Sequence, residues 1–146
     1  MRKFFVLFMV LVIGNSCINS RTPISRSSLI GTWTVIDDNY KDISESWNFT
    51  DSTLTQISYY KGIDKPVILR KMYYLCSEIP LRYDSSLVGK AMNGTYIAYY
   101  SRKQEVIKNY EFINLKNDTL TLRYYHAMAV GCEAGYGTLI LKRISR

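Results

Sequence analysis

Residues 29–37 read Leu-Ile-Gly-Thr-Trp-Thr-Val-Ile-Asp, and this stretch decides the fold class. Its apolar side chains and its threonines occupy alternate positions, so an extended chain places them on opposite faces. Such alternation is typical of an antiparallel strand that has one buried face and one solvated face. The stretch therefore predicts a β-strand whose inner face carries Leu29, Gly31, Trp33 and Val35.

The same alternation recurs along the rest of the chain. Trp47 and Phe49 share one face of a second run, and Leu120, Leu122 and Tyr124 share one face of a later run. Turn-forming pairs separate several of the runs: Asp51-Ser52, Asn93-Gly94 and Asn117-Asp118. We predict strands at residues 29–37, 44–50, 53–61, 67–76, 95–101, 105–113, 119–126 and 138–144.

This arrangement predicts an all-β fold. No long stretch shows the i, i+3, i+4 pattern of a structural helix, and residues 85–92 are expected to form one short helical turn or a loop. Eight antiparallel strands with mostly short connections favour an up-and-down barrel, because closure removes exposed edges. A two-sheet β-sandwich is the alternative.

Several short motifs carry a family resemblance over roughly residues 29–146. The segment 29–33 contains the Gly-x-Trp motif that opens the first strand of lipocalin-type barrels. The segments 47–49, 115–122 and 141–143 add to a pattern that resembles bacterial lipocalin-like lipoproteins. The resemblance implies that Trp33 closes the barrel floor, that Arg143 from the last strand stacks across it, and that Gly31 is structural.

The N-terminal seventeen residues have the pattern of an export signal. A positive start, an apolar run at residues 4–13 and small residues before Cys17 are typical of bacterial signal peptides. The run is shorter than the roughly 17 apolar residues that a spanning helix needs. Cys17 resembles the cysteine of a bacterial lipobox, which implies that it becomes the lipid-bearing first residue.

These features predict a domain organisation and a location. We expect a signal peptide at residues 1–16, a lipidated Cys17 followed by a flexible tether to residue 28, and a lipocalin-like barrel at residues 29–146. The tether is expected because residues 18–28 are polar, contain Pro23 and show no periodicity. The protein is expected to be exported and lipid-anchored in the outer membrane, facing the periplasm.

Charge and cysteine content limit the partners. The formal net charge is +7, and two of the positively charged residues, Arg2 and Lys3, lie in the expected signal peptide. Nucleic acid is not an expected partner. Cys76 and Cys132 are expected to form either a disulfide or two buried free thiols. No metal site or other cofactor is expected, and the carboxylates that follow the first strand are interpreted as a solvated loop: Asp37, Asp38, Asp42 and Glu45.

Tyrosine is over-used, with 13 residues of which eight form four adjacent pairs. Adjacent strand residues point to opposite faces, so each pair places one ring inside the barrel. The inward rings are predicted to be Tyr60, Tyr73, Tyr100 and Tyr124, with His126 continuing the face of Tyr124. These side chains either line a ligand cavity or fill the barrel.

The sequence favours binding over catalysis, because it contains no recognisable nucleophile and base motif. Two functional classes stay open. The barrel carries a small apolar or amphiphilic ligand, or it is packed and serves as an accessory subunit that binds another protein. A cavity of at least about 300 Å³ would support the first class, and a filled barrel with an exposed aromatic patch would support the second.

Overall fold

The computed structural model describes residues 23–36, 42–101, 106–125 and 136–145. Its strands and short helices are, in chain order, β1 (Ile24–Ser25), α1 (Arg26–Leu29), β2 (Gly31–Ile36), β3 (Ile43–Phe49), β4 (Thr53–Tyr60), β5 (Val67–Cys76), η1 (Ser85–Leu87), β6 (Asn93–Gly94), β7 (Tyr96–Ser101), β8 (Val106–Lys116), β9 (Thr119–Tyr125) and β10 (Tyr136–Ser145). No helix in these ranges has the length and apolar character that crossing a bilayer requires.

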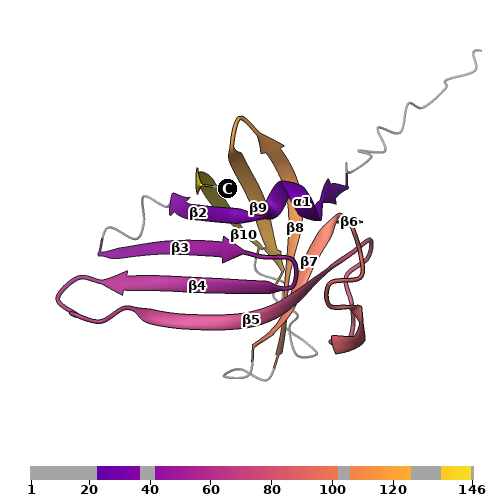
Figure 1. The fold of residues 1–146 in the computed structure, drawn as a ribbon, viewed down its shortest axis with the longest axis horizontal. Coiled ribbons are helices and arrows are strands. Elements are labelled where there is room, and N and C mark those ends of the chain that lie inside the picture. Colours follow the sequence, from indigo (N-terminus) through magenta and orange to yellow (C-terminus); the bar gives the residue numbers. More distant parts are fainter. Residues whose placement is uncertain (1–22, 37–41, 102–105, 126–135, 146) are drawn as a thin grey trace, which may run out of the picture.

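Eight of the strands form a closed barrel in the order β10-β2-β3-β4-β5-β7-β8-β9 (Figure 1). Every neighbouring pair in this barrel is antiparallel. The predicted eight-stranded up-and-down barrel is therefore confirmed, and the sandwich alternative is wrong. The β8–β9 turn has positive φ angles at Asn117 and Asp118, 52° and 56°, as a two-residue type I′ hairpin requires.

One half of the barrel interior is a continuous apolar core. The alternation predicted for β2, β3 and β9 is confirmed, because its apolar members are almost fully buried: Trp33, Trp47, Phe49, Leu120 and Leu122. Edge-to-face packing also links β3 to β5, with β4 between them; the ring centroids of Phe49 and Tyr73 lie 5.6 Å apart. This core forms one end of the barrel, which we call the floor.

Trp33 and Arg143 meet at the floor as the family resemblance implied. The two residues are register partners on β2 and β10, and the guanidinium carbon of Arg143 lies 4.0 Å from the Trp33 ring centroid. Arg143 also donates hydrogen bonds to the carbonyl oxygens of Ser28 and Ile30 and to the Asp118 carboxylate. Gly31 opens β2 with a φ of 124°, a conformation that L side chains rarely adopt.

The expected flexible tether is wrong for its last residues, 24–28. There β1 pairs with β6, and α1 follows directly, so that both lie against the floor (Figure 1). The Trp33 indole N–H donates to the Leu29 carbonyl oxygen at 2.8 Å, and Leu29 is fully buried. Gly94 is needed beside this segment, because a Cβ there would lie 2.8 Å from Leu75 Cβ. Residues 17–22 lie outside the described residues.

Candidate functional site

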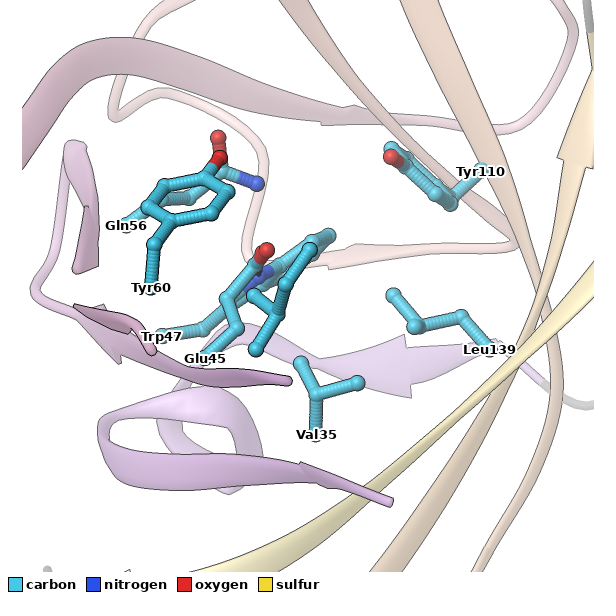
Figure 2. A pocket seen from close by; sticks show the side chains of 8 residues that line it. Val35, Glu45, Trp47, Gln56, Tyr60, Tyr110 and Leu139 are labelled. Atoms are coloured by element: carbon cyan, nitrogen blue, oxygen red, sulfur yellow. Dashed lines mark hydrogen bonds between the residues drawn. The ribbon is translucent and has the colours of Figure 1, made fainter. Parts of the chain in front are cut away.

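A cavity of about 390 Å³ lies in the barrel on the side of Trp47 away from the floor. It is lined by side chains from four neighbouring strands and from β8: Val35, Ile43, Glu45, Trp47, Gln56, Tyr60, Tyr110 and Leu139. Figure 2 shows Tyr110 and Leu139 across the cavity from Glu45, Gln56 and Tyr60. The wall therefore combines apolar and polar side chains, which is the composition of many small-molecule sites.

Glu45 supplies the carboxylate of the polar wall. The Trp47 indole N–H donates to its Oε1, and the Ser58 hydroxyl donates to its Oε2 at 3.4 Å. The prediction that Glu45 lies on a solvated loop is wrong, because β3 begins at Ile43 and its pairing turns residues 43, 45, 47 and 49 inward. Of the other three carboxylates in that group, only Asp42 lies within the described residues.

Two lysines also face the barrel interior, and the sequence analysis did not single them out. Lys71 on β5 donates a hydrogen bond to Gln56 Oε1, and its Nζ lies 4.3 Å from the ring centroid of Tyr99. Burial lowers the pKa of Lys71 to about 8; nearby Lys108 acts in the same direction, whereas Glu45 opposes the shift. Lys71 is therefore charged at neutral pH at a cost in desolvation.

Lys108 on β8 is the second inward lysine. Its Nζ donates to the Tyr124 hydroxyl and lies 4.9 Å from the centroid of that ring. Within the described ranges, neither Lys71 nor Lys108 has a carboxylate oxygen within 4.0 Å. Both ammonium groups are instead held by neutral oxygens and by the faces of tyrosine rings.

The tyrosines form a connected group behind the cavity wall. The hydroxyls of Tyr99 and Tyr110 lie 3.4 Å apart, and the ring centroids of Tyr110 and Tyr124 lie 4.9 Å apart. Burial raises the pKa of Tyr99 to about 12 and the pKa of Tyr110 well above its ordinary value. These phenols therefore stay protonated at neutral pH and remain able to donate a hydrogen bond.

Three of the four predicted inward tyrosines face inward, with different surroundings. Tyr60 lines the cavity, and Tyr124 packs against the lining residue Tyr110. Tyr73 is buried in the floor core, where its hydroxyl donates to the Thr50 carbonyl oxygen at 2.6 Å. Burial raises its pKa to about 12. Tyr73 therefore contributes packing and does not line this cavity.

The prediction for Tyr100 is wrong. The register pairs Tyr99 with Tyr73 and with Lys108, so Tyr99 faces inward and Tyr100 faces outward. Tyr100 is 37% exposed, and its ring centroid lies 5.9 Å from that of Tyr83 on the outside of the barrel. Tyr110, which belongs to no tyrosine pair in the sequence, lines the cavity.

Of the remaining predicted residues, only Cys76 lies in the part of the chain that the structure describes. Cys17, His126 and Cys132 lie outside the described residues. Cys76 is a free cysteine whose pKa burial raises to about 11, so the structure shows no disulfide at this position. The described ranges contain no group of three His, Cys, Asp or Glu side chains that could hold a metal ion.

A second hollow, of about 420 Å³, lies outside the floor between α1 and the β8–β9 turn. Its wall includes Arg143 and Asp118, which pair with each other at 3.0 Å. The inner cavity is the stronger candidate site, because among the described residues neither Glu45 in its wall nor the nearby Lys71 and Lys108 form an ion pair within 4.0 Å. Comparison of the chain with models of known families, with curated proteins and with solved structures finds no match.

Proposed function

We propose that the barrel is a binding protein, not an enzyme, and that its cavity carries a small apolar or amphiphilic ligand. The observation that carries this proposal is the cavity of about 390 Å³ above a closed floor, which exceeds the lower bound of about 300 Å³ for small-molecule sites. Its wall combines the apolar side chains of Val35, Ile43 and Leu139 with the polar groups of Glu45 and Gln56. A wall of this mixed kind suits an amphiphile.

Native mass spectrometry of residues 18–146, exported and purified without the anchor, tests the proposal. We expect a discrete added mass that disappears on denaturation. Val35→Trp should remove this mass by filling the cavity, whereas Ile36→Trp should keep it, because Ile36 is the exposed neighbour on the outer face of β2. A bare mass for the unsubstituted protein and both variants, even after exposure to a lipid extract, would contradict the proposal.

We also propose that the protein is a lipocalin-like lipoprotein, anchored in the outer membrane through Cys17 and facing the periplasm. The apolar run at residues 4–13 and the position of Cys17 support the anchor. The stacking of Arg143 on Trp33 inside an eight-stranded barrel supports the family resemblance. Cys17→Ser should move the exported protein from the membrane fraction to the soluble fraction, and complete retention in the membrane fraction would contradict the anchor.

One observation favours protein binding as a second candidate function. The β4–β5 hairpin exposes large apolar side chains, including Ile63 at 57% and Ile68 at 59%. Exposed apolar groups that gather on one hairpin are typical of interaction surfaces. Absence of any ligand in the mass measurement would favour this second function, in which the barrel serves as an accessory subunit.

A further inference from the structure

We propose that the cavity selects an amphiphile with an anionic head group, a carboxylate or a phosphate ester, which Lys71 and Lys108 attract and bind. This inference rests on the ligand-binding function proposed above and assigns the ligand its charge. The apolar chain would lie against Leu139, which lies across the cavity from Glu45 (Figure 2), and against the apolar lining residues Val35 and Ile43.

The two lysines lie beside the same tyrosine, Tyr99. Lys108 on β8 is the register partner of Tyr99 on β7, and Lys71 from β5 lies over the ring of that same tyrosine. Lys71 bonds the lining residue Gln56 directly, and Lys108 reaches the lining residue Tyr110 through Tyr124. Lys71 thus contacts a lining residue directly, and Lys108 contacts a residue that packs against one.

The charges of the described interior do not balance. Glu45 is the single carboxylate among the described residues that face the cavity, and its two oxygens accept hydrogen bonds from Trp47 and Ser58. Against it stand Lys71 and Lys108, for which the described ranges contain no ion pair. A partly buried cation without a paired anion is costly, and a bound anion would remove that cost.

Neutral hydrogen-bond donors strengthen the same preference. The phenols of Tyr99 and Tyr110 lie between the two lysines and stay protonated, because burial raises their pKa values. A protonated phenol can donate to a carboxylate or phosphate oxygen, and charge-assisted hydrogen bonds are stronger than neutral ones. A cationic ligand could use Glu45 and the ring of Trp47, but it would be repelled by both lysines.

Binding of a matched series of probes tests the proposal: decanoate, decyl phosphate, decanol and decylammonium. The chain contains two tryptophans, of which Trp47 lines the cavity, so intrinsic fluorescence of residues 18–146 reports binding. These residues include every described element of the barrel. We expect the two anionic probes to bind at least about ten-fold more tightly than decanol, as one charge-assisted hydrogen bond allows.

Single substitutions identify the residues. Lys71→Met and Lys108→Met should each weaken decanoate binding by about ten-fold and leave decanol binding unchanged, which also shows that the variants are folded. Lys142→Met is the matched control, because Lys142 is exposed on the outer face of β10, and it should change neither affinity.

The outcomes separate this inference from the function on which it rests. Equal affinities for decanoate and decanol, unchanged in both lysine variants, would overturn the anionic head group and leave ligand binding intact. Tighter binding of decylammonium would overturn it in favour of recognition by Glu45. Failure of all four probes to bind, together with a bare mass in the native spectrum, would overturn both.

Discussion

The floor of the barrel and its cavity are built from different kinds of side chain. At the floor, Trp33 is fully buried, its indole N–H has a carbonyl acceptor, and the guanidinium of Arg143 stacks on its ring. Around the cavity, Lys71 and Lys108 have no carboxylate oxygen within 4.0 Å among the described residues. The floor is arranged for stability, whereas the cavity retains groups that lower stability and remain available to a ligand.

The largest expected effect is at the floor. Trp33→Ala should lower the free energy of unfolding by about 3–5 kcal/mol, because it removes a fully buried aromatic side chain and leaves a cavity. Urea denaturation measures the change. A loss well below 1 kcal/mol would show that the floor is not the stable end of the barrel.

A smaller effect is expected for the residue that covers Trp33. Arg143→Met should cost about 1.5–3 kcal/mol, because the side chain loses its hydrogen bonds to Ser28, Ile30 and Asp118. Lys142→Met, the exposed neighbour, should change the free energy of unfolding by no more than about 0.5 kcal/mol. Equal effects of the two substitutions in urea denaturation would argue against a special role for Arg143.

The smallest effect has the opposite sign and lies at the cavity. Lys71→Met should raise the free energy of unfolding at pH 7 by up to ~1 kcal/mol, a gain that is limited because the side chain stays partly solvated. Its folded-state pKa of about 8 lies below the ordinary lysine pKa of 10.5, so the unfolded state binds more protons between these values. Stability contributed by this group therefore rises with pH in that window.

The pH dependence of urea denaturation from pH 7 to 10 checks the Lys71 prediction. The unsubstituted protein should gain stability across this range from Lys71, and the variant should lack that gain. Above pH 10 the sign reverses, because the raised pKa values of Tyr73 and Tyr99, about 12, cause stability to fall as these phenols ionise in the unfolded state. A variant less stable than the parent at pH 7 would contradict the contrast between floor and cavity.

Alternation was sufficient to predict the strands but not always which member of a pair faces inward. The predicted runs coincide with all eight barrel strands, since a buried face and a solvated face leave a period of two in the sequence. Where both neighbours are tyrosine, as at Tyr99-Tyr100, the alternation does not show which of the two rings faces inward. The pairing of β7 with β5 and β8 determines this. The inward lysines did carry a signal, because Lys71 alternates with Tyr73 and Lys108 with Tyr110.

The fold of residues 24–29 had no comparable signal. The helix α1 has four residues, too few to show a 3.6-residue period. Its position depends on partners far along the chain: the Arg26 N–H donates to the Met92 carbonyl oxygen at 2.7 Å, and Ser25 pairs with Asn93. Contacts between such distant segments depend on the closed barrel, which a local pattern does not describe.

The pairing of β1 with β6 also sets the orientation of the barrel relative to its proposed anchor. Ile24 is held against Gly94 at the floor end, and the chain between Cys17 and Ile24 can span at most about 25 Å when fully extended. A lipid on Cys17 would therefore keep the floor near the bilayer and turn the cavity toward the aqueous compartment. In that orientation the proposed ligand would enter the cavity from the aqueous side, and not from the leaflet that holds the proposed anchor.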